Sequence, residues 1–366
     1  MQKAQSAFEA YSKIDKNKRA FFLTEIANQI EKKRALLVPL AMEESHLPEA
    51  RLQGELTRTV NQLKMFAALV EEGSWVEAAI DKGNEDRKPL PKPDTRKMLL
   101  PIGPVVVFGA SNFPFAFSTA GGDTASALAA GVSVVVKMHP GHPETSKLVF
   151  DAMKEAVKIA EMPEFTVQHL NEGSFAAGKA LVKHPATAGV GFTGSFNGGR
   201  TLMNYAFERE KPIPVFAEMS SINPVVLYPE YLSLNAKETA KKLSSSITLG
   251  MGQFCTNPGL LLAIDGDGLE DFIREVTYDI EQSRPQPMLH EGIAENYVNA
   301  VSKIKSAGNV EIIADAGKNY TDKPETPLLA KISATNFLQN EYLKEEIFGP
   351  YSLLVVCKDK DELKQY

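Results

Sequence analysis

The first 73 residues carry apolar side chains at the spacing of amphipathic helices. They recur three or four positions apart in two runs: Phe22, Ile26 and Ile30, then Leu56, Val60, Leu63, Ala67 and Val70. Such spacing places each run on one face of a helix, and Pro48 separates the two because proline interrupts a helix interior. The pattern predicts a helical N-terminal region. The proline-rich segment 88–94 that follows is extended and suits either a connector or an edge strand.

After residue 104 the pattern changes to short apolar runs separated by turns and helical stretches. It predicts strands at 105–108, 132–137, 166–170, 188–193 and 213–216, and helices at 115–130, 143–160, 174–183 and 198–209. Strands that are apolar almost throughout are typical of parallel sheets with both faces covered. We therefore expect a doubly wound α/β domain, whose ligands bind at the carboxyl ends of its strands.

A second cycle of the same kind occupies the rest of the chain. It predicts strands at 224–228, 260–264, 310–314 and 352–357, and helices at 236–249, 268–282 and 291–307. The sequence thus predicts two doubly wound parallel α/β lobes, over residues 1–218 and 219–366. The chain stops within a helix that Asp359 opens and no turn residue closes.

The composition of the chain argues against several kinds of binding partner. The 366 residues are 43% hydrophobic and 23% charged, with a net charge of −6, and no basic block indicates nucleic acid or a membrane surface. The sequence has no apolar stretch long enough to span a membrane and no signal region at its N-terminus. Two cysteines suit a reducing compartment, so we expect a cytoplasmic protein. The six histidines lack metal-ligand spacing, which predicts no metal site.

Three side chains suggest covalent catalysis. Cys255 lies in G-M-G-Q-F-C-T-N-P-G (250–259), a predicted loop that can present a nucleophilic thiol to a cleft. Glu218 follows the apolar strand P-V-F-A, where partial desolvation would suit a general base. Asn112 offers a neutral amide N–H to an oxyanion. The alternatives are a small buried cysteine, a surface glutamate and a turn asparagine.

The segment F-T-G-S-F-N-G-G (192–199) joins a predicted strand to a predicted helix. Its glycines let backbone approach a phosphate, and a helix N-terminus favours negative charge, although the G-x-G-x-x-G spacing is absent. Lys137 ends another strand, where it either contacts a ribose or phosphate or is simply solvated. Asn112, Lys137, Ser195 and Glu218 each follow a predicted strand, so we expect them on one rim of the sheet.

Together, six segments resemble those of the NAD(P)-dependent aldehyde dehydrogenase superfamily, in the same order and nearly from end to end. They are P-I-G-P-V-V-V-F-G-A-S-N-F-P-F, V-V-V-K-M-H-P, F-T-G-S-F-N-G-G, P-V-F-A-E-M-S-S-I-N-P, G-Q-F-C-T-N-P-G and E-E-I-F-G-P. Six linked motifs are far more specific than any one. The Asn112 and Cys255 segments look most like the branch holding α-ketoglutarate-semialdehyde (2,5-dioxovalerate) dehydrogenases and NADP-linked fatty aldehyde dehydrogenases.

The resemblance implies the aldehyde dehydrogenase fold and the oxidation of an aldehyde, such as the semialdehyde 2,5-dioxopentanoate, to its acid. It assigns the nucleophile to Cys255, the base for the deacylating water to Glu218, and the oxyanion hole to the Asn112 amide with the Cys255 backbone N–H. The same matching assigns NADP or NAD binding to Lys137 at the adenosine ribose, to Gly194, Ser195 and Gly199 near the pyrophosphate, and to Glu346 and Phe348 at the nicotinamide half.

The sequence departs from the family pattern at three places. Pro140 stands where NAD-preferring relatives commonly have an acidic residue, which removes repulsion of a 2′-phosphate. With His139 beside it, we expect NADP to be accepted well. Ser111 replaces the usual tryptophan before the oxyanion asparagine. Both chain ends are short beside the family pattern, so the resemblance implies that the second, catalytic lobe is truncated. The extended segment at about 86–100 would then be half of an oligomerisation device. For the full-length protein we expect a homodimer or homotetramer.

Two other interpretations stay open. An acylating reductase of the same fold, linked to coenzyme A or to glutamyl phosphate, uses the cysteine but lacks the water-activating glutamate, so Glu218 favours the hydrolytic branch. A non-catalytic member that keeps the fold for binding or assembly is disfavoured by the presence of Cys255, Glu218 and Asn112 together. The sequence alone places no Arg or Lys at the far carboxylate of a semialdehyde.

Overall fold

A five-stranded parallel sheet organises the first of the two units into which the computed structural model divides, Met1–Met219 and Ser220–Tyr366. The structure describes residues 1–365, and each unit is described by itself. The first sheet has the order β5-β4-β3-β6-β7, and every pairing in it is parallel. Its strands are β3 (Val105–Phe108), β4 (Val134–Lys137), β5 (Val167–Leu170), β6 (Gly189–Thr193) and β7 (Val215–Glu218).

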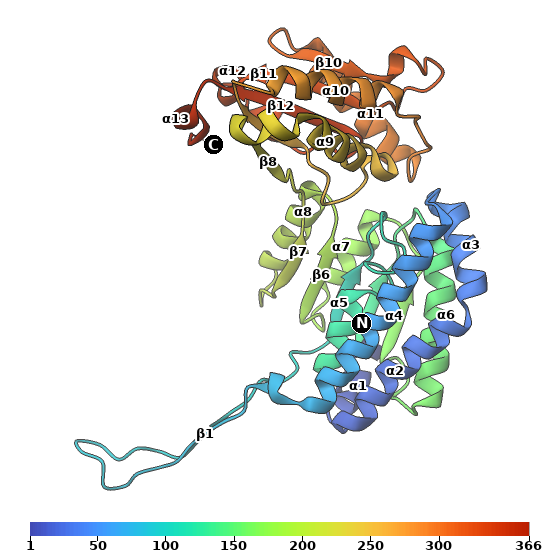
Figure 1. Ribbon diagram of the computed structural model, residues 1–366. Helices are drawn as coiled ribbons and strands as arrows, with labels where there is room; N and C mark the ends of the chain where they lie inside the picture. The colour runs from blue at the N-terminus through green and yellow to red at the C-terminus, as the bar shows by residue number, and fades with distance from the viewer. Residues whose placement is uncertain (366) are drawn as a thin grey trace. The chain divides into compact units, whose positions relative to one another are not determined.

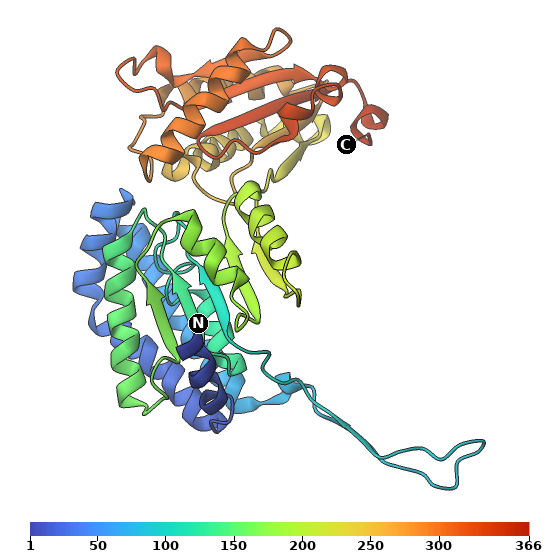
Figure 2. The ribbon, with the colours of Figure 1, turned by 180° about the vertical axis from the view of Figure 1, so that it is seen from behind.

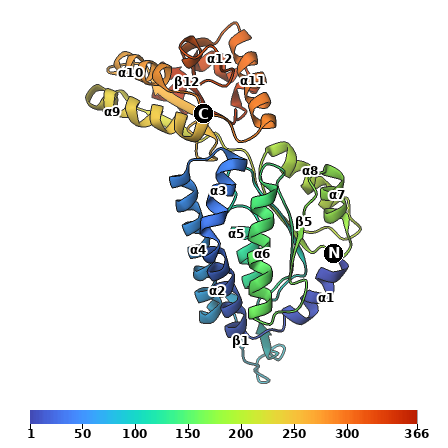
Figure 3. The same ribbon diagram turned by 90° about the vertical axis from the view of Figure 1, so that its right-hand side faces the viewer.

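Helices cover both faces of this sheet (Figures 1 and 3). One face carries α5 (Gly122–Ala130) and α6 (Pro143–Ile159), and the other carries α7 (Phe175–Lys183) and α8 (Phe196–Phe207). An N-terminal layer packs on α5 and α6 and consists of α1 (Gln2–Tyr11), α2 (Lys16–Lys32), α3 (Arg34–Ser45) and α4 (Glu49–Glu72). Pro48 caps α4, whose predicted apolar face is buried. Removing that face from water stabilises the layer by roughly 25 cal/mol per Å².

An antiparallel hairpin follows α4 and the short η1 (Ser74–Val76) in the first unit. It extends away from the helices of that unit (Figures 1 and 2). β1 (Ala79–Asp81) pairs with β2 (Thr95–Lys97), and one further bridge joins Asn84 to Lys92. Both strands are exposed along their whole length. The segment at 86–100 is therefore the tip and second strand of a hairpin, and the interpretation as a plain connector is wrong.

The predicted helix over 115–130 is wrong in its first half, because residues 115–120 form turns. The backbone N–H groups of Phe115 and Ala116 donate to Oε1 of Glu55 at 2.8 and 3.0 Å. Hydrogen bonds to α4 therefore hold this stretch of backbone in turns, and no helix begins there. At Gly121 an added Cβ would lie 2.3 Å from the Ala116 carbonyl oxygen, so glycine is required where this turn closes.

The second unit has a five-stranded sheet of order β10-β11-β12-β9-β8. Its strands are β8 (Pro224–Leu227), β9 (Leu260–Ile264), β10 (Glu311–Asp315), β11 (Leu328–Ser333) and β12 (Tyr351–Cys357). The α/β fold class is confirmed, but the expectation of a wholly parallel second sheet is wrong, because β10 is antiparallel to β11. A loop with η3 (Ala316–Lys318) joins them and no crossover helix intervenes, so the chain returns in the opposite direction. The pattern of apolar positions predicts no strand over 328–333, where β11 lies.

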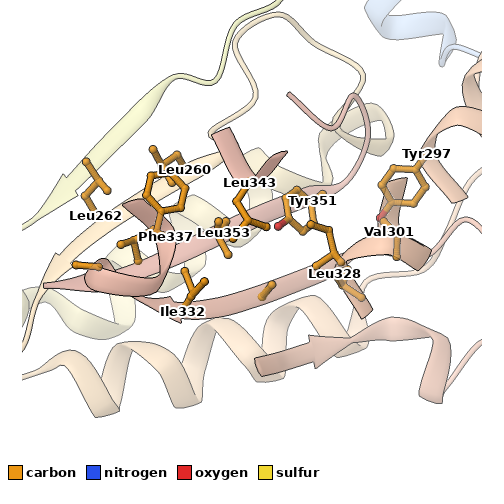
Figure 4. Close-up of a cluster of buried hydrophobic side chains, with 14 of the residues drawn as sticks. Leu260, Leu262, Tyr297, Val301, Leu328, Ile332, Phe337, Leu343, Tyr351 and Leu353 are labelled. Atoms are coloured by element: carbon orange, nitrogen blue, oxygen red, sulfur yellow. The ribbon is translucent and has the colours of Figure 1, made fainter. Parts of the chain in front are cut away.

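Helices cover both faces of the second sheet as well. On one side of the sheet, α9 (Pro229–Thr248) and α10 (Leu269–Gln282) pack against Leu261, Ala263 and Leu354. The other side packs α11 (Glu291–Ser306) and α12 (Ala334–Leu338) on a cluster drawn in Figure 4, with Tyr297, Phe337 and Leu353 among its members. The remaining short helices are η2 (Leu249–Gly252), η4 (Glu341–Lys344) and α13 (Lys360–Leu363). These cores fix the ends of the loop that carries Cys255.

Candidate active site

The carboxyl ends of the first unit's strands share one edge of the sheet. β3 and β6 are neighbours there although β4 and β5 come between them in the chain, so the chain changes direction across the sheet at this point. Ligands of doubly wound sheets bind at such switch points. Asn112 follows β3, Ser195 follows β6, and Lys137 and Glu218 end β4 and β7. The structure thus places all four residues at one edge, as the sequence predicts.

The N-terminus of α8 lies at the end of β6. Ser195 is its N-cap, and the Ser195 hydroxyl accepts the N–H of Gly198 at 3.2 Å. Gly194 and Ser195 are exposed, so the first turn of the helix offers backbone N–H groups and positive dipole to an anion. At Gly199 an added Cβ would lie 2.6 Å from the Met219 sulfur. Glycine therefore lets α8 approach the end of β7.

Lys137 is only 8% exposed, and its Nζ donates to the Gly173 carbonyl oxygen at 3.2 Å. Burial lowers the pKa of Lys137, and the nearby carboxylate of Glu172 opposes that shift. His139 is half-buried, and its Nδ1 accepts the N–H of Gly141 at 3.0 Å. The sequence analysis missed Glu172. It is a carboxylate close to the lysine that the resemblance assigns to the adenosine ribose.

Helix α4 fixes the loop that carries Asn112. Arg51 Nη2 donates to the Asn112 carbonyl oxygen at 2.7 Å, and Glu55 accepts the N–H groups of Phe115 and Ala116. Glu55 is 5% exposed; burial raises its pKa, and those two hydrogen bonds oppose the rise. Asn112 itself is buried. Sequence reasoning missed Arg51 and Glu55, although an acidic residue on an apolar helix face is a signal that could have found Glu55.

Glu218 ends the edge strand β7 and is exposed. The partial desolvation predicted from the apolar strand is therefore absent, because an edge strand has a neighbour on one side only. Asp123 of α5 is half-buried, and its pKa is raised by burial and by the negative charge of Glu218. At Gly191 of β6 an added Cβ would lie 3.0 Å from Asp123 Oδ2. Glycine there leaves room for a second carboxyl group beside Glu218, which the sequence analysis missed.

In the second unit, a left-handed turn leads into the Cys255 loop. Gly250, Met251 and Gly252 have φ of +52°, +58° and +62°. At Gly252 an added Cβ would lie 2.2 Å from the Gly349 carbonyl oxygen, so the close approach of these two segments requires glycine. Residues other than glycine rarely adopt positive φ, and Met251 therefore stores strain at the base of the loop.

Asn223 holds the loop from β8 and was missed as a functional residue. Its Nδ2 donates to the carbonyl oxygens of Cys255 at 2.7 Å and Asn257 at 2.9 Å. Asn257 Nδ2 in turn donates to the carbonyl oxygens of Gly349 and Tyr351 at 3.3 and 3.2 Å. Cys255 is half-buried and forms no disulfide. These bonds orient the backbone of the thiol-bearing residue.

Glu346 and Phe348 line a small cavity with the Cys255 loop, represented there by Phe254 and Asn257. Burial raises the pKa of Glu346, while hydrogen bonds from the Ser220 hydroxyl and the Ser221 backbone N–H oppose the rise. The second unit thus brings together the predicted nucleophile loop and the residues that the resemblance assigns to the nicotinamide half.

The whole chain, residues 1–366, matches the family described as the aldehyde dehydrogenase family. The chain belongs to this family. It is 46% identical over 360 residues to α-ketoglutaric semialdehyde dehydrogenase 2 of Azospirillum brasilense and 40% identical over 366 residues to α-ketoglutaric semialdehyde dehydrogenase of Acinetobacter baylyi. These alignments cover 98% and 99% of this chain and 69% of each relative. Membership places it among the NAD(P)-dependent oxidoreductases.

Solved structures of aldehyde dehydrogenases share its fold. Betaine aldehyde dehydrogenase of Staphylococcus aureus, solved with NAD⁺, matches all of this chain with a TM-score of 0.83 at 18% identity, over 72% of its own length. Proline utilization A of Bradyrhizobium japonicum matches with a TM-score of 0.81 at 21% identity, and this chain spans 36% of that protein. At these identities the likeness shows the fold alone.

The residues predicted for an aldehyde dehydrogenase site belong to both units. Asn112, Lys137, Ser195 and Glu218 lie in the first and Cys255 in the second, so the convergence of the three catalytic groups stays a prediction. Among residues 1–365, no cluster of three or more His, Cys, Asp or Glu side chains could hold a metal ion. No helix in the same range is long and apolar enough to cross a membrane.

The residues of the first unit fit a dinucleotide. A helix N-terminus with exposed Gly194 and Ser195 suits a pyrophosphate, and Lys137 lies one strand from the switch point with its Nζ directed to a loop carbonyl. Both features belong to the strand edge at which such folds bind nucleotides.

Proposed function

We propose that this chain oxidises an aldehyde to the carboxylic acid with NAD(P), through a thioester on Cys255, and that its substrate is a semialdehyde of the α-ketoglutaric type. One observation carries the proposal: Phe254 and Asn257, on either side of Cys255 in its loop, line one small cavity with Glu346 and Phe348, in a chain 46% identical to an α-ketoglutaric semialdehyde dehydrogenase. The loop that carries the thiol thus lies beside the segment to which the family resemblance assigns the nicotinamide half of the cofactor.

The chain's own groups supply the steps. The Cys255 sulfur adds to the aldehyde carbon, and the Asn112 amide with the Cys255 backbone N–H stabilises the oxyanion. Bound NAD(P) accepts the hydride that leaves when the oxyanion collapses to a thioester. Glu218 takes a proton from the water that attacks the thioester, which releases the carboxylate and regenerates the thiolate. Because Glu218 is exposed, water can reach it.

Cys357 provides a matched control for Cys255. It is buried in β12, and burial, with Glu362 and Asp359 nearby, raises its pKa to about 11. It therefore stays a thiol at neutral pH and is a poor nucleophile. We expect Cys255→Ala to abolish formation of NAD(P)H from 2,5-dioxopentanoate, with a loss of at least about 10³-fold. The Cys357→Ala variant keeps its turnover; full activity of Cys255→Ala would refute the proposal.

The product separates hydrolysis from acyl transfer. An acylating reductase releases acyl-CoA when coenzyme A is present, whereas Glu218 predicts free 2-oxoglutarate with or without it. Chromatography of the reaction mixture decides between these outcomes. Accumulation of acyl-CoA would move the chain to the acylating branch.

A further inference from the structure

Two aromatic rings flank the Asn112 loop and meet an arginine from α4. Phe113 and Phe117 pack edge to face, with ring centroids 5.0 Å apart at 88°. The guanidinium carbon of Arg58 lies 5.9 Å from the Phe113 centroid and 5.1 Å from the Phe117 centroid. Both distances are within the range of a cation–π contact. A cation is therefore held beside the residue that follows Asn112.

The two arginines on this face of α4 make different interactions. Arg51 Nη2 donates to the Asn112 carbonyl oxygen at 2.7 Å and lies 3.7 Å from Glu55 Oε2. Arg58, two turns further along the helix, is exposed and forms no salt bridge with any residue that the structure describes. Its guanidinium lies against the two rings, and its charge also acts on the buried carboxylate of Glu55. Arg51 thus supports the loop, whereas the guanidinium fork of Arg58 stays available to an anion.

We propose that Arg58 binds the far carboxylate of the substrate and thereby selects semialdehydes of dicarboxylic acids over neutral aldehydes. The inference rests on the proposed function, in which the Asn112 amide holds the aldehyde oxygen. A planar guanidinium binds a carboxylate through two parallel N–H···O bonds. Phe113 and Phe117 offer an apolar surface to the methylene groups between the two ends.

The far carboxylate of the substrate lies close to its aldehyde carbon. In 2,5-dioxopentanoate four C–C bonds separate the aldehyde carbon from the carboxylate carbon, about 5 Å when extended. Phe113 directly follows Asn112 in the chain, and its ring lies within 6 Å of the Arg58 guanidinium carbon. An aldehyde with a cationic tail would meet like charge and bind poorly.

The test compares 2,5-dioxopentanoate with pentanal, an uncharged aldehyde of the same chain length, in wild type and Arg58→Met. The ratio of kcat/KM for the two substrates falls by at least about tenfold in the variant, mainly through a higher KM for the dioxo acid. Arg58→Lys restores part of the ratio, because it keeps the charge and loses the fork. The control is Lys64→Met, which removes one charge from the exposed side of the same helix and leaves the ratio unchanged.

A binding measurement adds a readout independent of turnover. Calorimetric titration with 2-oxoglutarate, the product, gives a Kd that rises at least about tenfold in Arg58→Met, while thermal unfolding confirms that the variant is folded. An unchanged kcat/KM ratio in a folded, active Arg58→Met overturns the subsite and leaves the proposed function standing. If wild type oxidises neither aldehyde with NAD or NADP, the proposed function itself fails.

Discussion

At the scale of single residues, Glu218, the proposed base, has an acidic neighbour to which the proposed mechanism gives no role. Asp123 is half-buried, and burial and the charge of Glu218 raise its pKa. A carboxyl group whose pKa is raised by folding stabilises the folded state below its unfolded pKa, and this contribution is lost as pH rises through the folded value. Above the folded value, the charge of Asp123 therefore opposes folding.

We expect Asp123→Asn to be more stable than wild type at neutral pH, with a gain of about 2 °C in Tm that shrinks toward zero as the pH falls to about 4. Calorimetry across that pH range measures it. Asp151→Asn, which removes a half-buried carboxylate of α6 paired with Lys154, is the control. A gain that is constant with pH would show that the repulsion is not its source.

Cofactor choice also depends on single residues. Pro140 offers no charge, but Glu172 places a carboxylate close to Lys137, where a 2′-phosphate would meet it. We expect Glu172→Gln to tighten NADP binding about threefold to tenfold relative to NAD. Calorimetric Kd values for both cofactors provide the comparison, with Glu164→Gln as a charge-matched control. If wild type already strongly prefers NAD and the variant does not change that preference, the expectation drawn from Pro140 is wrong.

At the scale of elements, α4 determines where Asn112 lies. Replacing Glu55 by alanine leaves the N–H groups of Phe115 and Ala116 unpaired in the interior, which costs about 2–4 kcal/mol. The Asn112 loop then loosens, and kcat falls because the oxyanion donor is misplaced. Denaturant unfolding and steady-state kinetics measure both effects. Glu55→Gln keeps an acceptor and should lose less; equal losses in both variants would implicate the charge rather than the hydrogen bonds.

The elements also show how far the sequence could predict this protein. Strands β3, β4 and β9 were predictable because continuous apolar runs between turns are typical of buried parallel strands. The false helix at 115–120 was not, because its cause is a glutamate 60 positions earlier in the chain. Likewise Asn223, Asp123 and Arg58 act through tertiary contacts that leave no local pattern. The site residues that the sequence predicts lie in recognisable motifs. The residues that hold them in place lie outside these motifs and could not be predicted.

At the scale of the whole molecule, the two strands of the hairpin β1–β2 pair only with each other within the part of the chain that the structure describes, so their outer edges are unpaired. Its strands are exposed, and Ile80 and Leu90 are 67% and 68% exposed. Edges of this kind pair with another chain or are covered, so we propose that the hairpin joins copies of this protein. Replacing residues 82–94 by an Asn-Gly turn should reduce the mass measured by light scattering to that of the monomer. An unchanged mass would place the subunit contact elsewhere.

The central claim is that Cys255 carries the acyl group until Glu218 activates water. Mass spectrometry of Glu218→Gln after brief mixing with 2,5-dioxopentanoate and cofactor tests it most directly. We predict one equivalent of NAD(P)H per site, followed by very slow turnover, and an acyl adduct on the peptide that contains Cys255. An adduct on another residue, or rapid turnover with no adduct at all, would contradict the account.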